Sequence, residues 1–264
     1  MSADINKSAE NELKTTLEDV ELPSEVHTLS KSTVNNPTLA NPEFYNKAQK
    51  YWSEVPATVN GMLGGLGFIS TIDIQGSNGF LRELRNLGKK CALDCGAGIG
   101  RVAKNLLMPR FATVDMVEQD KNFSKTAQDY CTSNIESTLK LSDRLGTIYN
   151  VGLQQFSPEA EKYDLIWSQW VLGHLTDEDL LAFFQRLRLG IAKGGYFVIK
   201  ENVTTTKNIE LDDVDSSVTR PLKVYENLLC ESGFRIVKTT RQQRFPKGLY
   251  PVYMIACKPD AKIV

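Results

Sequence analysis

This sequence has few histidines and almost no net charge. Only two of the 264 residues are histidine, His27 and His174, and no group of cysteines has the spacing of a zinc site. Basic and acidic residues are nearly balanced, 31 against 32, which gives a formal net charge of −1. We therefore expect no bound metal, no direct contact with nucleic acid and no attraction to anionic membranes.

Long apolar runs are missing as well. No run approaches the roughly 20 residues that cross a membrane, and the N-terminal residues lack the apolar core of a signal peptide. Cysteines number five, and two of them, Cys91 and Cys95, lie in an apolar segment. An odd number in such positions favours core thiols in a reducing compartment over disulfides.

Residues 1–42 contain no aromatic residue and show no hydrophobic periodicity. Their composition, rich in Ser, Thr, Asn, Glu and Lys, predicts a disordered polar tail. The Asn-Pro pairs at 36–37 and 41–42 indicate a boundary, because the residue before a proline avoids helical geometry. Residues 43–264 are long enough for one α/β domain.

The most informative segment is residues 91–101. An apolar run, Cys91 to Cys95, ends in glycines at 96, 98 and 100, and apolar residues at helical spacing follow, which predicts strand, tight turn and helix. Glycine lets the backbone approach a ligand, and the start of a helix offers unpaired N–H groups. A second apolar run, 113–117, ends at Glu118, whose carboxylate can accept both hydroxyls of a ribose.

The glycine spacing distinguishes between nucleotides. A dinucleotide fingerprint needs its third glycine at position 101, where this chain has Arg101. The form G-x-G-x-G after an Asp-bearing strand is typical of Rossmann-like S-adenosylmethionine-dependent methyltransferases. A turn that merely packs a helix on the sheet is the alternative for any single glycine, but three glycines and the spaced acid disfavour it.

Strands and helices are expected to alternate along the rest of the domain, as in a doubly wound sheet. Further strands are predicted at 147–151, 163–167 and 196–200, and helices at 122–133 and 177–189. Before the sheet, residues 43–88 form an N-terminal helical extension, with helices at 44–52 and 77–87. The glycine-rich residues 61–69 between them form a lid over the cofactor, a wall of the substrate pocket, or a loop that seats the first helix.

Polar residues gather where the predicted strands end, which is the ligand-binding edge of a doubly wound sheet. His174 and Asn202 lie there, and residues 210–217 place four carboxylates in one long connection. A lone histidine is more often structural, and an acidic run is usually a solvated face. At this edge, however, the combination favours a cationic substrate group.

Several blocks of this sequence together resemble the eukaryotic protein α-N-terminal methyltransferases, over about residues 43–258. The blocks are 51–52, 60–65, 91–101, 114–117, 152–154, 169–171, 173–177 and 211–217. Members of that family methylate the free terminal amine of proteins that begin, after Met removal, with Xaa-Pro-Lys. The resemblance implies a class I Rossmann-like fold with a seven-stranded sheet, and S-adenosylmethionine as cofactor.

The resemblance also implies roles for matching positions. The cofactor residues are Gly96, Arg101, Glu118, Leu153, Gln154 and Gln169, with Arg101 pairing the cofactor carboxylate. The substrate residues are Trp52, Leu63, Gly64, Ile69 and Trp170 around the second-position proline, Asp212 and Ser217 at the third-position lysine, and Leu249 and Tyr250. Asn202 and Asp215 hold the terminal amine, and Asp215 and His174 are the expected general bases.

This chain departs from the family pattern at two places. Glu118 stands where the family often has Asp, and residues 247–250 replace a more acidic segment. The resemblance implies ribosomal and chromatin-associated proteins with Xaa-Pro-Lys termini as partners, and a location in the cytoplasm and nucleus.

The chemistry independently requires a base. A terminal amine has a pKa of about 7.7–8.0, so much of it is protonated at neutral pH and cannot attack a methyl carbon. A carboxylate or a histidine near its ordinary pKa can take that proton.

Three alternatives stay open on the sequence. A methyltransferase for another amine acceptor would share the cofactor site. A nicotinamide-dependent oxidoreductase is disfavoured by Arg101. A non-catalytic module would bind basic N-terminal tails through the acidic run without turnover.

Overall fold

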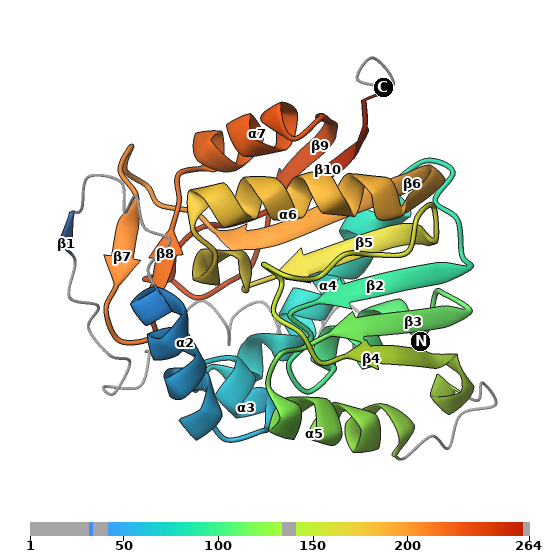
Figure 1. Cartoon of the computed structure of the whole chain (residues 1–264), viewed down its shortest axis with the longest axis horizontal. Helices are drawn as coiled ribbons and strands as arrows, with labels where there is room; N and C mark the ends of the chain where they lie inside the picture. Colours follow the sequence, from blue (N-terminus) through green and yellow to red (C-terminus); the bar gives the residue numbers. More distant parts are fainter. Residues whose placement is uncertain (1–31, 34–41, 134–140, 261–264) are drawn as a thin grey trace, which may run out of the picture.

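The fold is a seven-stranded mixed sheet between two layers of helices (Figure 1). We describe it from a computed structural model, which covers residues 32–33, 42–133 and 141–260. The strand order is β4-β3-β2-β5-β6-β10-β9, in which the first five strands run parallel and β10 and β9 are antiparallel to their neighbours. The strands are β2 (Cys91–Cys95), β3 (Thr113–Val117), β4 (Leu145–Tyr149), β5 (Tyr163–Gln169), β6 (Ile191–Asn202), β9 (Phe234–Arg241) and β10 (Val252–Pro259). The predicted doubly wound, seven-stranded fold is confirmed.

The central strand β2 explains why the pattern could be recognised. All five of its residues are buried, as expected for a parallel strand that is covered on both faces. It pairs with β3 on one side and β5 on the other. The glycine turn therefore emerges at the middle of the sheet edge, next to the ends of two further strands.

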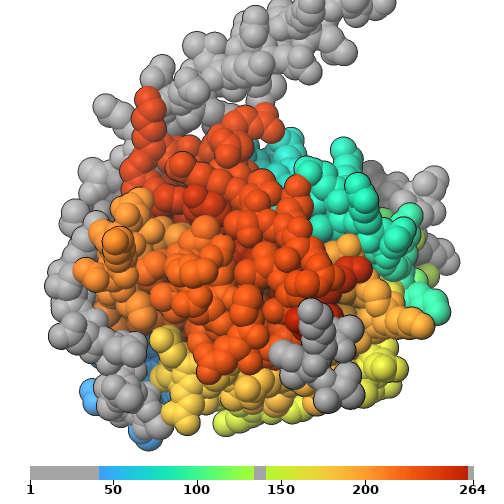
Figure 2. Space-filling model, turned by 90° about the horizontal axis from the view of Figure 1, so that it is seen from above, coloured from blue at the N-terminus to red at the C-terminus, as the bar shows by residue number. Residues whose placement is uncertain are grey.

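Two hydrophobic cores cover the two faces of the sheet. On one face, α6 (Asp177–Gly190) and α7 (Leu222–Glu231) contribute Phe183 and Tyr225. On the other, α4 (Ser70–Arg82), a π-helical turn (Ala103–Leu107) and α5 (Lys121–Thr132) contribute Phe80, Leu106 and Ala127, respectively. Figure 2 shows the side of α7, where the C-terminal part of the chain, orange to red, forms most of the surface.

The helix predicted at 77–87 is misplaced, because α4 begins at Ser70 and ends at Arg82. Its buried side includes two polar residues, Asp73 and Ser77, which interrupt the apolar periodicity that the prediction relied on. The strand predicted at 196–200 is longer in the structure, because β6 begins at Ile191 and pairs with β5 through a register shift between Tyr163 and Leu165.

The N-terminal extension lies at the edge of the sheet to which the parallel strands point (Figure 1). It contains α2 (Pro42–Glu54), α3 (Val59–Met62) and a 3-10 turn (Gly67–Ile69) that leads into α4. Helix α2 is fixed to the start of α6, because the Tyr45 hydroxyl donates to the Asp179 carboxylate and accepts from the Thr176 N–H. The extension therefore closes over the edge where ligands are expected.

A second, three-stranded sheet is not foreseen from the sequence. It consists of β1 (Ser32–Thr33), β7 (Glu210–Asp212) and β8 (Ser217–Thr219). The predicted disordered tail, residues 1–42, lies outside the described residues except for β1 and for Pro42, where α2 begins.

Two further expectations concern burial and membranes. Four of the five cysteines are buried thiols, but Cys230 is exposed on α7, so the expectation of core thiols is wrong for that residue. In the part of the chain that the structure describes, no helix is long and apolar enough to span a membrane.

Candidate active site

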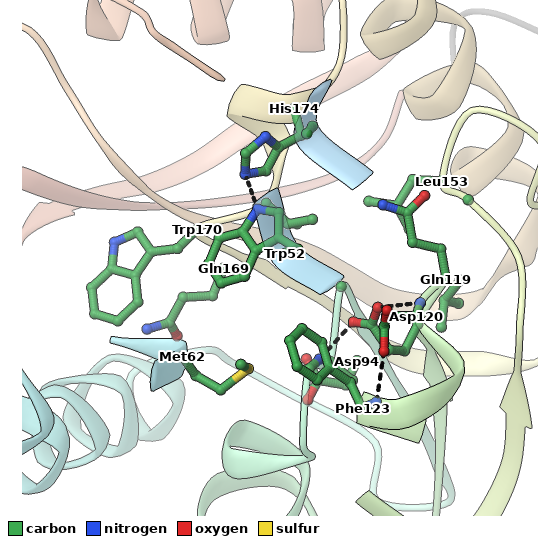
Figure 3. A pocket seen from close by; sticks show the side chains of 18 of the residues that line it. Trp52, Met62, Asp94, Gln119, Asp120, Phe123, Leu153, Gln169, Trp170 and His174 are labelled. Atoms are coloured by element: carbon green, nitrogen blue, oxygen red, sulfur yellow. Dashed lines mark hydrogen bonds between the residues drawn. The ribbon is translucent and has the colours of Figure 1, made fainter. Parts of the chain in front are cut away.

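A single pocket at the carboxyl ends of the parallel strands gathers half of the predicted site residues (Figure 3). Its lining includes all six predicted cofactor residues, Gly96, Arg101, Glu118, Leu153, Gln154 and Gln169. It also includes three predicted substrate or catalytic residues, Trp52, Trp170 and His174. The structure thus brings together positions that are more than one hundred residues apart in the chain.

The glycine turn owes its shape to backbone geometry that only glycine adopts easily. Gly96 has φ of +70°, and a Cβ there would lie 2.4 Å from a methyl group of Val171. Gly98 has φ of +55°, and its N–H donates to Oε2 of Glu118 over 2.8 Å. The turn is therefore held against the acid that follows β3.

Two buried carboxyl groups face the pocket beside this turn. Glu118 also accepts from the N–H of Asp120, and burial raises the pKa of its carboxyl above the usual value. Each of its oxygens keeps a further lone pair, so a pair of hydroxyls can still donate to it. Asp94, which we did not predict as a site residue, accepts from the N–H of Ala103, and burial raises its pKa to about 7.

The loop that carries Leu153 and Gln154 is fixed by an arginine that the sequence did not reveal. Arg186 of α6 donates to the carbonyl oxygens of Leu153, Gln154 and Phe156 over 2.8–3.0 Å. Apolar side chains also line the pocket, among them Met62 and Phe123. Such residues are indistinguishable from core residues in a sequence, so no pattern could have identified them.

Arg101 and Gln169 line the pocket but are also bound within the protein. Both donate to the carboxylate of Asp73, Arg101 through Nη1 over 2.7 Å and Gln169 through Nε2 over 2.9 Å. The Arg101 guanidinium also lies 5.6 Å from the centre of the Trp170 ring. The sequence predicted contacts of Arg101 and Gln169 with a cofactor but not their shared partner.

Trp170 and His174 lie in the short segment between β5 and α6, which buried charges hold in place. Trp170 has φ of +53°, a conformation that non-glycine residues rarely adopt. Glu201 accepts from the N–H groups of Val171 and Leu172, both over 2.9 Å. Arg220 donates to the carbonyl oxygens of Leu172 and Leu175 and pairs with Asp177.

Both ring nitrogens of His174 face protein atoms. The indole N–H of Trp52 donates to Nε2 over 2.9 Å, and Nδ1 lies 3.4 Å from the carbonyl oxygen of Ser216. Burial lowers the pKa of His174, although the nearby charge of Asp215 opposes this. The hydrogen bonds assign a neutral imidazole with its proton on Nδ1.

The acidic run is a hairpin, not the long connection that we expected. Strands β7 and β8 place Asp212 directly opposite Ser217, so the two residues predicted at the substrate lysine are neighbours. The tip of the hairpin contains Asp215 and Ser216, which has φ of +54°. Its acids are thereby directed toward His174 and α2.

Asp215 has one buried oxygen, Oδ1, with no hydrogen-bond partner among the described residues. Burial raises the pKa of this carboxyl above its usual value, and the hydrogen bonds from Ser217 offset part of that rise. A buried carboxylate oxygen without a donor is costly in a folded protein, and it is a ready acceptor for a cationic group.

The other predicted substrate residues lie outside the pocket lining. Leu63 and Ile69 are buried in the extension, with Gly64 between them, and Asn202 ends β6 opposite Val252. The Tyr250 hydroxyl donates to Glu210 over 2.5 Å, whereas Leu249 is half-buried. A residue that we did not predict, Phe245, packs with its ring centre 6.4 Å from that of Trp170.

Trp170 carries a second unpaired polar atom. Its indole N–H is buried and has no acceptor within the described ranges.

Among the residues that the structure describes, no group of three or more His, Cys, Asp or Glu has the arrangement of a metal site.

The chain is similar to known methyltransferases over most of its length. The family model described as AdoMet dependent proline di-methyltransferase matches residues 40–258. An alpha N-terminal protein methyltransferase 1 of Drosophila melanogaster is 64% identical over 220 residues, which cover 83% of this chain and 78% of that protein. The N-terminal Xaa-Pro-Lys N-methyltransferase 1-A of Xenopus laevis is 46% identical over 222 residues, which cover 82% of this chain and 96% of that protein.

A solved structure agrees with these sequence matches. A SAM-dependent methyltransferase from Leishmania major superposes with a TM-score of 0.76 at 37% identity, covering 83% of this chain and 85% of that one. The likeness therefore extends to the three-dimensional fold.

Proposed function

This chain belongs to the family of AdoMet-dependent proline di-methyltransferases, and from that membership we propose that it methylates the free α-amino group of proteins that begin with Xaa-Pro-Lys. The methyl donor is S-adenosylmethionine. The observation that carries the acceptor assignment is the unpaired buried oxygen of Asp215, next to the pocket lined by His174. An amine is the kind of group that such an oxygen accepts from.

The residues of the pocket suit this cofactor. Glu118 offers carboxylate oxygens for the ribose hydroxyls, Arg101 offers a cation for the carboxylate, and Met62, Phe123 and Leu153 offer apolar contacts for the adenine. When bound, the cofactor supplies a methyl group on a sulfonium centre. The protein's part is then to hold the acceptor nitrogen in line and to exclude water.

Asp215 is the group that removes the amine proton in this proposal. His174 accepts from Trp52 at Nε2, and its Nδ1 proton faces the Ser216 carbonyl, so neither nitrogen is free to accept. Asp215 has a free oxygen, and its raised pKa brings its basicity closer to that of the amine. In this arrangement His174 orients Trp52, and Asp215 accepts the amine proton.

The other substrate groups follow from the hairpin and the aromatic side chains. Trp52 and Trp170 offer a rigid apolar surface for proline, and the unpaired N–H of Trp170 can donate to a substrate carbonyl. Asp212 and Ser217, paired across β7 and β8, accept from a third-position lysine. We extend the proposal to ribosomal and chromatin-associated target proteins in the cytoplasm and nucleus.

A peptide panel tests this function. Ser-Pro-Lys, Ser-Ala-Lys and Ser-Pro-Gln peptides are incubated with S-adenosylmethionine, and the initial rates are compared. We expect the first to be methylated fastest, since it alone presents both the rigid ring and the cation. Equal rates for all three would favour another amine acceptor, and cofactor binding with no turnover on any amine would favour a binding module.

A further inference from the structure

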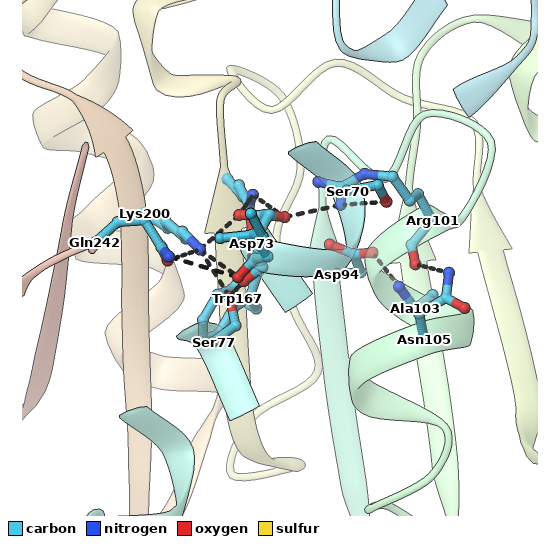
Figure 4. A network of polar contacts seen from close by, with 12 residues as sticks. Ser70, Asp73, Ser77, Asp94, Arg101, Ala103, Asn105, Trp167, Lys200 and Gln242 are labelled. Atoms are coloured by element: carbon cyan, nitrogen blue, oxygen red, sulfur yellow. Dashed lines mark hydrogen bonds and ion pairs between the residues drawn. The ribbon is translucent and has the colours of Figure 1, made fainter. Parts of the chain in front are cut away.

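One buried carboxylate ties together groups from four parts of the fold (Figure 4). Asp73 of α4 has no exposed surface, and its two oxygens accept from Arg101 over 2.7 Å, Gln169 over 2.9 Å and Lys200 over 2.5 Å. Arg101 follows the glycine turn, Gln169 ends β5, and Lys200 lies on β6. Two of them, Arg101 and Gln169, line the pocket, whereas Asp73 and Lys200 lie behind it.

The charges of this network are settled by its hydrogen bonds. The Nζ of Lys200 lies 2.5–3.0 Å from four oxygen atoms, those of the Asp73 carbonyl, the Asp73 carboxylate, Ser77 and Gln242. An ammonium group has three N–H donors for these acceptors and a neutral amine only two, so the surroundings favour the ammonium form. Burial opposes ionisation of Asp73, but the charges of Lys200 and Arg101 outweigh it and hold its pKa below the usual value. One carboxylate thus faces two cations, which leaves one cation in excess beside the pocket.

We propose that Asp73 is a positioning residue for the cofactor carboxylate: it fixes the Arg101 guanidinium and the Gln169 amide at the pocket wall, and with Lys200 it sets the local charge to one net cation. This inference rests on the proposed placement of the cofactor. Arg101 uses one Nη for Asp73, so its remaining N–H groups are held in a defined direction. A preorganised guanidinium loses less entropy when it binds an anion.

The alternative is that Asp73 only compensates the buried Lys200. The contacts of Asp73 argue for more, because Gln169 donates to both of its oxygens and takes the indole N–H of Trp167 on its own oxygen. Every polar atom of the Gln169 side chain is thereby oriented. The geometry also makes α4, which follows directly from the glycine-rich segment, part of the cofactor site.

Calorimetric binding without peptide tests the proposal, using S-adenosylmethionine and its decarboxylated analogue, which lacks only the carboxylate. In Asp73→Asn we expect the affinity for S-adenosylmethionine to fall about tenfold or more, as for a lost hydrogen bond to a charged group, while that for the analogue changes less than about twofold.

Asp115→Asn is the matched control, since Asp115 is also buried and paired, with Lys162 and Tyr163, but does not line the pocket. It should affect the two ligands equally. If Asp73→Asn does not fold, the double variant Asp73→Asn/Lys200→Met removes both buried charges and should show the same selective loss.

Equal losses for both ligands in the Asp73 variants, or tighter binding of S-adenosylmethionine, would overturn the positioning role. Failure of the unaltered protein to bind S-adenosylmethionine would instead contradict the proposed function. The two failures are therefore distinguishable in one experiment.

Discussion

The indole N–H of Trp52 donates a hydrogen bond to Nε2 of His174 across 2.9 Å. This contact joins helix α2 of the N-terminal extension to the segment between β5 and α6. It also occupies the nitrogen through which a histidine would otherwise accept a substrate proton. The roles of the two expected bases consequently differ in the mechanism that we propose, in which Asp215 accepts the proton and His174 orients Trp52.

The tautomer of His174 is directly measurable. The chain has only two histidines, so a His27→Gln variant leaves His174 as the sole imidazole signal. We expect nitrogen chemical shifts at pH 7 to show protonated Nδ1 and unprotonated Nε2, because Nε2 accepts from Trp52. Trp52→Phe removes the donor and should allow the Nε2–H tautomer to appear. Detection of Nε2–H in the parent protein would contradict this arrangement.

Replacing Asp215 should separate catalysis from cofactor binding. Asp215→Asn cannot take the amine proton, so we expect turnover of Ser-Pro-Lys peptide to fall by about 10²-fold or more, the usual contribution of a general base. The affinity for S-adenosylmethionine should change little. His174→Gln is the comparison variant and should lose less turnover than Asp215→Asn. A normal turnover number in Asp215→Asn would remove this residue from the mechanism.

The acidic hairpin should determine the preference for a third-position lysine. Asp212→Asn is expected to raise the KM for Ser-Pro-Lys peptide about fivefold, as for a partly exposed ion pair worth about 1 kcal/mol. The same change should leave the KM for Ser-Pro-Gln peptide unaltered. Steady-state kinetics on both peptides provide the comparison, and an equal change for the two would place the lysine contact elsewhere.

Much of the fold followed from the sequence because its signals are local. The glycine turn of residues 96–100 and the strands β2 and β3 depend on neighbouring residues, so their pattern was sufficient. The start of α4 was missed because its buried side carries Asp73, whose partners come from elsewhere in the fold. The same applies to Arg186, which binds carbonyl oxygens of a distant loop.

The sequence predicts residues for the site but not the contacts between them. Family resemblance identified His174 and Asp215, yet nothing in the sequence indicates that Trp52 occupies one nitrogen of His174. The hairpin of β7 and β8 was also missed, since its short strands and acidic composition resemble a solvated loop. Contacts between distant segments, not residue types, account for these differences.

Stability should depend on the protonation of Glu201, which burial shifts to a pKa of about 7 despite the N–H groups that it accepts from. Because the folded-state pKa is raised above the usual 4.5, the folded state binds the proton more tightly than the unfolded chain. The resulting stabilisation is complete below about pH 4.5 and is lost as the pH rises to about 7.

Glu201→Gln keeps an acceptor for the same N–H groups and does not titrate. Over this range we expect the free energy of unfolding of the parent protein to decrease relative to the variant, by up to about 3 kcal/mol. Urea unfolding of both proteins at several pH values gives the difference. A constant difference across the range would show that Glu201 does not titrate there.

Mass spectrometry of a Ser-Pro-Lys peptide, beside the same peptide acetylated at its amino end, tests the central claim most directly. In the proposed mechanism the α-amine is both the nucleophile and the cation that Asp215 binds, and acetylation removes both properties. We predict mass gains in steps of one methyl group on the free peptide alone, localised by fragmentation to the α-nitrogen. Methylation of the acetylated peptide, or of the lysine side chain in either one, would contradict the assignment of the terminal amine as the acceptor.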